Sequence, residues 1–305
     1  MALAGTGRPF VAYSADSFFR KPLSADAPVD ADSAQGIAYA NTNDPYDYPR
    51  IRGVEGNRWG EPYGMGTCTD PVWKLTGTVP APVAFLKTEG FHAPADFADT
   101  LTGTSDSPAT AIDVHGVPSM PQGLTVWLFR AARGSGYTIN VGSAGAYQHD
   151  SNGLDKRSTR STSTKNFSTA RGNILGSEVI RDDLLEYGMV NNTDLGHVLE
   201  MFWLETDSGA GYVHPLINFE KNKYGWGPEG IRIRVKPDID LDARCTGYAR
   251  VVAKTLQNYG AVLGDNSGSG SGIKAEQGST KLTQGALAGC VTWDDMVFVQ
   301  RGWDG

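Results

Sequence analysis

The stretch "IRIRVKPDIDLDARCTGYARVVAKTLQNYGAVLGDNSGSGSG", residues 231–272, carries the clearest secondary-structure pattern of the chain. In its first five residues isoleucine or valine stands at every odd position, with Arg232 and Arg234 between them. The side chains of a strand point alternately to its two faces. The pattern therefore predicts a strand with one face in the core and the two arginines in water.

A helix is predicted to follow this strand. Its apolar stripe recurs at positions i, i+4, i+8 and i+11, formed by Tyr248, Val252, Leu256 and Tyr259. Gly260 stands where helices often end in the left-handed conformation. We expect this helix to cover the sheet. The segment "GDNSGSGSG", residues 264–272, lacks the Gly-Lys-Ser/Thr of a phosphate loop and is too glycine-rich for a nucleophile elbow, which favours a flexible hairpin or connector.

The composition favours a fold rich in β-structure. The chain has 305 residues, of which 40% are hydrophobic, enough for a large core. Its 38 glycines and 16 prolines suit many short strands joined by turns better than a helical bundle. We therefore expect a mainly β fold, a jelly-roll-like β-sandwich with one or two short helices packed on the sheet. Residues 1–70 are predicted as an extended N-terminal arm packed on the core, and residues 71–305 as a single β-sandwich domain.

Short apolar runs between turn signals mark further elements. Strands are predicted at residues 83–86, 124–129, 136–141 and 197–204. Short helices are predicted at residues 33–39 and near Ser177, the latter ending at Gly188. Residues 149–173 are polar, small and locally basic, and such a composition buries too little apolar area to order itself. We expect a long exposed loop there.

Charge and hydropathy argue against two classes of partner. The net charge is −7, with 27 basic residues against 34 acidic ones, whereas nonspecific nucleic-acid binding needs a basic surface. No run of about eighteen apolar residues is present, so no membrane span is expected. The start of the sequence lacks the basic and apolar regions of a Sec signal peptide.

The three cysteines, Cys68, Cys245 and Cys290, are far apart, which favours buried or semi-buried free thiols.

Five segments of the chain resemble a known family. They are "SADSFFRKPLSADAPVDADSA", "LEYGMVNNTDLGHVLEM", "YVHPLINF", "GPEGIRIRVKPDIDL" and "RVVAKTLQNYGAVLGDNSGS". In that order they resemble a poorly characterised family of secreted actinobacterial and acidobacterial proteins, with relatives among minor tail proteins of phages that infect actinobacteria. The resemblance implies a jelly-roll-like β-sandwich that faces the cell envelope or a polysaccharide, and it supplies no agreed catalytic residues. His197 matches a histidine of the family pattern, whereas Glu229 replaces its usual methionine and His214 its usual aromatic residue before a proline.

Candidate catalytic residues lie in "HVLEMFWLETD", residues 197–207. Glu200, Glu205 and Asp207 suggest the paired carboxylates of a sandwich-fold glycoside hydrolase, which stand about 5–5.5 Å apart in retaining enzymes. On a regular strand, however, Glu200 and Glu205 face opposite sides unless a bulge intervenes. His197 is weighed as a catalytic base against a hydrogen-bonded core histidine. The structural role is favoured in each case, so enzymatic activity stays open, with a non-enzyme preferred.

No metal site or cofactor is predicted. The other histidines form no His-x-x-x-His or His-x-Glu pattern; they are His92, His115, His149 and His214. The segment "AGAYQH", residues 144–149, approaches the tyrosine and glutamine strand of sandwich-fold alginate lyases but lacks the partner motifs of that family.

Aromatic residues favour carbohydrate recognition instead. Seven tryptophans and twelve tyrosines suit stacking on sugar rings, while asparagine, aspartate and arginine bond the hydroxyls. The candidates in glycine-rich loop contexts are Trp59, Tyr63, Tyr224, Trp226 and Trp303. The glycines around Trp226 predict an indole that stands clear of the backbone. Trp127 and Trp203 lie in predicted strands and are less suited to binding.

These observations lead us to expect a phage tail-associated protein, a minor tail or receptor-binding component that recognises a host cell-envelope glycan. Its expected location is the virion tail or the extracellular space. The alternatives are a glycoside hydrolase or polysaccharide lyase acting on actinobacterial cell-wall polysaccharide, and a purely structural virion protein. The expected partners are the glycan and other virion tail proteins. A homo-oligomer is also expected, because repeated weak sites gain avidity.

Overall fold

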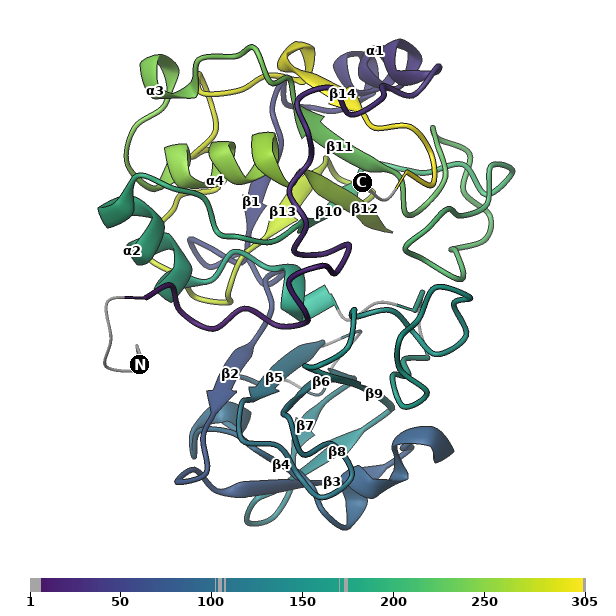
Figure 1. The fold of residues 1–305 in the computed structure, drawn as a ribbon, viewed down its shortest axis with the longest axis vertical. Coiled ribbons are helices and arrows are strands. Elements are labelled where there is room, and N and C mark those ends of the chain that lie inside the picture. Colours follow the sequence, from purple (N-terminus) through teal and green to yellow (C-terminus); the bar gives the residue numbers. More distant parts are fainter. Residues whose placement is uncertain are drawn as a thin grey trace. The chain divides into compact units, whose positions relative to one another are not determined.

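The computed structural model describes residues 7–303 except 102, 104, 105, 107, 170, 173 and 174 (Figure 1). The chain divides into two compact units. Unit 1 comprises the described residues of Met1–Val11, Phe18–Gly60 and Glu178–Gly305, and unit 2 comprises those of Ala12–Ser17 and Glu61–Ser177.

Unit 1 is built around one six-stranded mixed sheet. Its strands are β1 (Arg50–Arg52), β10 (Leu199–Trp203), β11 (Arg232–Val235), β12 (Ala261–Asn266), β13 (Gly272–Lys274) and β14 (Met296–Phe298). Their order across the sheet is β1-β13-β10-β12-β11-β14. The central strands β10 and β12 pair in parallel, so both end at the same edge of the sheet.

Helices cover this sheet. Those of unit 1 within the described part of the chain are α1 (Ser33–Asn43), α2 (Asp182–Asn191), α3 (Leu241–Arg244), α4 (Gly247–Asn258) and the 3-10 turn η4 (Trp293–Asp295). α4 buries Val252 and Leu256 in a cluster that also holds Ile233 of β11 and Leu263 of β12. Figure 1 shows α2 beside α4, and α1 beside β14. The described helices are all too short or too polar to cross a membrane.

Unit 2 contains two four-stranded mixed sheets. The first, in the order β2-β5-β6-β9, consists of β2 (Tyr63–Gly66), β5 (Ala109–Asp113), β6 (Leu124–Phe129) and β9 (Ser143–Gln148). The second, in the order β4-β3-β8-β7, consists of β3 (Val72–Gly77), β4 (Phe91–His92), β7 (Ala132–Arg133) and β8 (Thr138–Val141). The 3-10 segments are η1 (Ala81–Lys87), η2 (Phe97–Thr100) and η3 (Leu175–Glu178). Glu178, the last residue of η3, is the first residue of the third segment of unit 1. One hydrophobic cluster draws on both sheets, with Trp73 and Ile139 from one and Val126 and Ala146 from the other.

The prediction of a mainly β fold is confirmed, but the described residues form four α-helices rather than the one or two that were expected. The expected division of the chain differs from the observed one. Residues 1–70 contain α1, β1 and β2 rather than an extended arm alone, and the units divide the sequence after Gly60 and Ser177 rather than at residue 70. Pairing between distant segments explains the difference, because β1 pairs in parallel with β13, a strand from the last part of the sequence.

Most predicted elements are present. The strands predicted at residues 124–129, 136–141, 197–204 and 231–235 correspond to β6, β8, β10 and β11. The predicted strand at residues 83–86 is wrong, because prolines at positions 80 and 82 favour the 3-10 segment η1 there. α1 begins at the predicted Ser33 and runs to Asn43. The helix expected near Ser177 instead begins at Asp182, continues through Gly188 and ends with Asn192 at a φ of 51°.

The two arginines of β11 are buried rather than in water. Arg232 and Arg234 are each 4% exposed. Arg232 donates to the carbonyl of Tyr259 at 2.5 Å, and Arg234 donates to the carbonyls of Ser24 and Gln257 at 2.7 and 2.6 Å. Burial, followed by the charge of Arg234, lowers the pKa of Arg232 to about 9. The prediction of a solvated face is wrong because main-chain carbonyls replace water around both guanidinium groups.

Residues 149–169 are ordered by their own polar contacts. The buried carboxylate of Asp155 accepts from the Arg157 guanidinium at 2.7 and 2.9 Å, from the Tyr147 hydroxyl at 3.1 Å and from the Ser168 amide at 3.0 Å. Burial raises the pKa of Asp155, but the hydrogen bonds from Arg157 and the Ser168 amide, together with the charge of Arg157, outweigh burial and lower it. The segment is a loop with many exposed residues, as predicted, but it also buries Asp155, Asn166 and Ser168. The prediction that it cannot order itself is wrong, because hydrogen bonds order a segment with little apolar area. Positions 170 and 173 of that segment lie outside the described residues.

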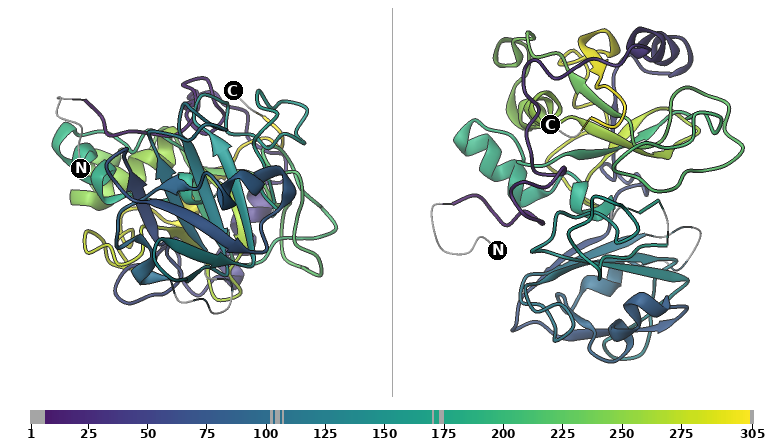
Figure 2. Two further views of the ribbon diagram at one scale, coloured as in Figure 1. Left: turned by 90° about the horizontal axis from the view of Figure 1, so that it is seen from below. Right: turned by 45° about the vertical axis from the view of Figure 1, so that its right-hand side comes forward.

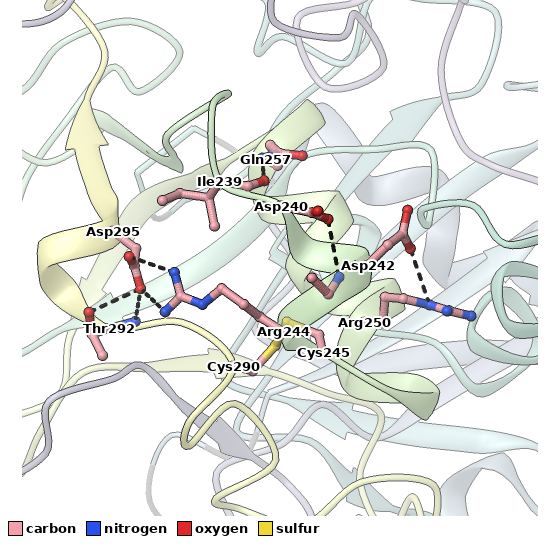
Figure 3. The surroundings of a disulfide bond; sticks show 11 residues. Ile239, Asp240, Asp242, Arg244, Cys245, Arg250, Gln257, Cys290, Thr292 and Asp295 are labelled. Atoms are coloured by element: carbon pink, nitrogen blue, oxygen red, sulfur yellow. Dashed lines mark hydrogen bonds and ion pairs between the residues drawn. A yellow bond between two sulfur atoms is a disulfide. The ribbon is translucent and has the colours of Figure 1, made fainter.

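Cys245 and Cys290 form a disulfide, with their Cα atoms 4.9 Å apart, and Cys68 is free and exposed. The prediction of three buried or semi-buried thiols is therefore wrong. Figure 3 shows the bond beside the ion pair of Arg244 with Asp295, whose hydrogen bonds measure 2.9 and 2.7 Å. A separation of 45 residues carries no pairing signal in a single sequence, which is why the pattern missed the bond.

Candidate functional site

Polar side chains gather at the edge of the unit 1 sheet where β10 and β12 both end. After β10 the chain makes a long excursion, residues 205–230, before it enters β11; we call this segment the aromatic loop. Figure 2 shows it in green, projecting beyond the strand ends. After β12 the chain crosses to β13 through residues 267–271. Ligands frequently bind beyond the carboxyl ends of parallel strands, so this edge of the sheet is a candidate binding site.

Asn266, the last residue of β12, holds the aromatic loop at this edge. Its side-chain oxygen accepts from the amide of Thr206 at 2.6 Å and from the Thr206 hydroxyl at 3.0 Å. Its Nδ2 donates to Oε2 of Glu220 at 2.9 Å and to Oε1 of Glu229 at 3.0 Å. Glu229 is 1% exposed, whereas the side chain of Glu220 is 37% exposed. One amide group therefore joins a buried carboxylate to a carboxylate that solvent can reach.

The aromatic loop is held together by its own hydrogen bonds. The Ser208 hydroxyl donates to the carbonyl of Glu220 at 2.9 Å and accepts from the amide of Lys223 at 2.8 Å. The ammonium group of Lys223 lies 3.2 Å from the carboxylate of Glu220. The amide of Glu220 in turn donates to Oε1 of Glu229 at 3.0 Å. A loop ordered in this way loses less conformational freedom when it binds a ligand.

Two tyrosines of the aromatic loop present their rings to solvent. Tyr212 is 46% exposed and stacks on Phe219, with ring centroids 6.0 Å apart and planes at 27°. Tyr224 is 83% exposed. Main-chain bridges place Tyr212 beside Glu229 and Tyr224 beside Asp207. Exposed aromatic faces next to carboxylate and amide groups are typical of surfaces that stack on sugar rings and bond their hydroxyls.

The candidate carboxylates of residues 197–207 lie in three different surroundings. Glu200 is buried in the middle of β10, where a Cβ added to Gly264 would come within 2.5 Å of its Oε1. Glu205 lies beyond the end of β10. The pKa of Tyr39 is raised first by the burial of its own hydroxyl and second by the negative charge of Glu205. Asp207 accepts from a main-chain amide two residues later in the aromatic loop, at 2.8 Å. A bulge does interrupt the pairing of β10 with β12, but it produces no ladder of these three carboxylates.

His197 is buried, with 2% exposure. Its Nδ1 lies 2.7 Å from the carbonyl of Val198, so Nδ1 carries the proton and donates. Burial lowers its pKa to about 4, and the charges of Arg181 and Arg8 act in the same direction. The interpretation as a hydrogen-bonded core histidine therefore describes its surroundings better than the role of a catalytic base.

Trp226 packs against the core instead of standing clear. Its indole lies against the rings of Phe298 and Trp203, with centroid separations of 4.4 and 6.4 Å. A Cβ added to Gly36 of α1 would come within 2.5 Å of the indole. The neighbouring Gly225 is needed because a Cβ there would meet a main-chain carbonyl at 2.0 Å. The prediction of an indole that stands clear of the backbone is therefore wrong. Gly225 allows a main-chain carbonyl to approach closely, and it does not free the indole of Trp226.

The remaining aromatic candidates are dispersed. Trp59 is 43% exposed and lies under the guanidinium group of Arg58, 5.0 Å from the ring centroid. Trp303 is half-buried near the end of the described chain, and Tyr63 is half-buried in β2 of unit 2. Of the predicted ligand-binding residues, the structure places Tyr224 and Trp226 in the aromatic loop.

Sequence reasoning missed the three residues that organise this edge, Asn266, Glu220 and Glu229. Asn266 lies in "GDNSGSGSG", which the composition marked as a flexible connector, yet Ser271 of that segment is fixed by a 2.6 Å bond from its amide to Asp44. The available signal was a polar Asp-Asn pair directly after a buried apolar run. The signal at Glu229 was its proline and glycine neighbours, and a single sequence does not show which residues contact its carboxylate.

The site offers carboxylates, an amide, an ammonium group and two exposed rings. The described residues include no group of three or more histidine, cysteine, aspartate or glutamate side chains arranged to hold a metal ion. Such a set can bind polyhydroxylated ligands by hydrogen bonds and stacking, and its joined carboxylates could also exchange protons. No family model, curated protein or solved structure matches the chain, so the geometry of the site carries the functional argument.

Proposed function

We propose that the chain is a phage tail-associated protein that binds a host cell-envelope glycan through the aromatic loop. The observation that carries the glycan-binding part is the exposure of Tyr212 and Tyr224 on a loop ordered around Glu220 and Asn266. Two exposed rings beside hydrogen-bonding groups suit a saccharide, whose ring faces are apolar and whose edges carry hydroxyls. The assignment to a tail, and to other virion tail proteins as partners, rests on the family resemblance.

One further feature supports a location outside the host cytosol. The Cys245–Cys290 disulfide is typical of proteins that work in oxidising surroundings, such as virions and secreted proteins. We also propose that the two sheets of unit 2, which share one core, correspond to the jelly-roll-like sandwich implied by the resemblance. A homo-oligomer would multiply the aromatic loop and raise the avidity for a repetitive polymer.

A binding assay with product analysis tests this function. The purified chain is incubated with envelope polysaccharide from actinobacterial cells, arabinan and galactan included, and both bound protein and released sugar are measured. Saturable binding without release of reducing ends or unsaturated products supports the proposal. Absence of binding, together with stable assembly into a complex with other tail proteins, would favour the purely structural virion protein instead.

A glycoside hydrolase is the second candidate, and one observation favours it. The carboxylate oxygens of Glu220 and Glu229 both lie within 3.0 Å of the same nitrogen, so they are less than about 6 Å apart, close to the about 5–5.5 Å of retaining glycosidases. In this role the reachable Glu220 would protonate the leaving oxygen and then take a proton from the water that attacks next. Release of reducing ends by the wild type and its loss in Glu220→Gln, with unchanged polysaccharide binding, would establish the enzyme.

A further inference from the structure

A buried carboxylate in unit 2 orients a histidine. Asp113, the last residue of β5, has no exposed side-chain surface. Its Oδ2 accepts from Nδ1 of His92 and from the amide of His92, both at 2.8 Å. Its Oδ1 accepts from the amides of His115 and Gly116 at 2.9 and 2.7 Å. Four donors converge on this one carboxylate, so the positions of both histidines are fixed by the same group.

These bonds determine which nitrogen of His92 is available. An ionised carboxylate only accepts hydrogen bonds, so Nδ1 of His92 carries the proton and Nε2 of the neutral ring keeps its lone pair. The His92 side chain is 14% exposed. A carboxylate that holds the far nitrogen of a histidine is the usual outer partner of a metal-binding imidazole.

The ring of His115 lies next to the ring of His92. Their centroids are 5.2 Å apart and their planes are at 84°. Two imidazoles bound tetrahedrally to one metal, each with its nitrogen about 2.0–2.1 Å from the ion, have their centroids about 5 Å apart. We propose that His92 and His115 form a two-histidine site for a divalent transition metal, with Asp113 as the outer carboxylate.

The expected site is open and weak. Since the described residues include no group of three or more potential ligands, water or a ligand of another molecule completes the coordination. Imidazole ligands favour copper, nickel and zinc over magnesium or calcium, and affinity for divalent ions should increase from manganese through cobalt and nickel to copper. His149 is a poor substitute for either ligand, because it is buried and its Nε2 lies 3.1 Å from the Thr125 hydroxyl.

Calorimetric titration of the untagged chain with ZnCl₂, after treatment with a chelator, tests the proposal. We expect one zinc ion per chain, and binding weakened more than about tenfold by His92→Asn and by His115→Asn, since each removes half of the protein ligands. His214→Gln is the matched control, because His214 is half-buried in unit 1 against Phe18, and its binding curve should equal that of the wild type. Electron paramagnetic resonance of the Cu²⁺ complex should show two coordinated nitrogens.

A measurement on the wild type covers variants that fail to fold. Zinc should protect His115, which is exposed, from modification by diethyl pyrocarbonate, as read by mass spectrometry. The proposal is overturned if the wild type binds no zinc at millimolar concentration. It is equally overturned if both His92→Asn and His115→Asn bind like the wild type, or if zinc leaves the modification of His115 unchanged.

Discussion

Asn266 shows how one side chain can define a site that no motif reveals. Its four hydrogen bonds reach Thr206, Glu220 and Glu229, which lie 37 to 60 residues away in sequence. The apolar stripe of α4 and the alternation of β11 could be read from the sequence because they are local patterns. The partners of Asn266 could not be read in this way. A glycine-rich segment has the same composition whether its asparagine is solvated or forms hydrogen bonds inside the protein.

Replacement of Asn266 by alanine should destabilise unit 1. The Thr206 amide loses its acceptor and Glu229, which is buried, loses a donor, and each such loss costs about 1–3 kcal/mol. Urea unfolding of Asn266→Ala and wild type measures the difference. Asn218→Ala, at an exposed position of the same loop, should leave the unfolding midpoint unchanged. Equal stability of Asn266→Ala and wild type would show that the amide does not organise this edge.

His197 should make the stability of the protein depend on pH. Its folded pKa of about 4 lies below the ordinary value of 6.5 because of burial. The unfolded chain therefore binds the proton first as pH falls, so this contribution to stability is complete above pH 6.5 and is lost between pH 6.5 and about 4. The loss approaches about 3 kcal/mol. His197→Phe should flatten the pH dependence of the unfolding free energy in this window, whereas an unchanged slope would refute the burial argument.

At the scale of the element, the periodic segments were predictable and the polar ones were not. α4 and β11 follow from apolar spacing, and Gly260 has the expected positive φ of 71°. The burial of Arg232 and Arg234 and the order of residues 149–169 depend on carbonyls and carboxylates supplied by other segments. Composition alone assigns such polar residues to solvent, because a single sequence does not show which partners will satisfy them.

Loss of the Asp155 carboxylate should open residues 149–169 to proteolysis. Asp155→Ala removes the acceptor of Arg157, Tyr147 and Ser168, which should cost about 1–3 kcal/mol and release trypsin sites at Lys156, Arg157, Arg160 and Lys165. Limited trypsinolysis followed by mass spectrometry detects the cuts. Asp150→Ala, at an exposed neighbouring position, should resist trypsin as the wild type does. Equal resistance of both variants would mean that other contacts order the segment.

At the scale of the whole molecule, composition correctly favoured β-structure, whereas the division into units was beyond sequence reasoning. The six-stranded sheet combines β1, β10 and β13, and the larger segment of unit 2, Glu61–Ser177, is inserted between β1 and β10 in the sequence. An insertion of this kind leaves no mark in local periodicity, because each segment keeps its own apolar pattern. The same holds for the disulfide, whose cysteines are adjacent only after unit 1 has folded.

The disulfide predicts a defined thiol count and a stability contribution. Native, unreduced protein should contain one reactive thiol, Cys68, by reaction with a thiol reagent. Replacement of both Cys245 and Cys290 by serine should lower the unfolding free energy by about 2–4 kcal/mol, since the bond closes a long loop in the unfolded chain. Cys68→Ser is the control and should retain wild-type stability. Three reactive thiols in the native protein would contradict the pairing.

The binding constant for envelope polysaccharide in tyrosine variants tests the central claim most directly. Tyr212→Ala and Tyr224→Ala should each weaken binding roughly two- to tenfold, because a stacked ring contributes about 0.5–1.5 kcal/mol beyond its buried area. Their melting temperatures should stay close to that of the wild type, since both rings are exposed. Tyr137→Ala is the matched control, being 47% exposed in unit 2, and should bind like the wild type. Wild-type affinity in both aromatic-loop variants would contradict the account and place glycan recognition elsewhere or nowhere on this chain.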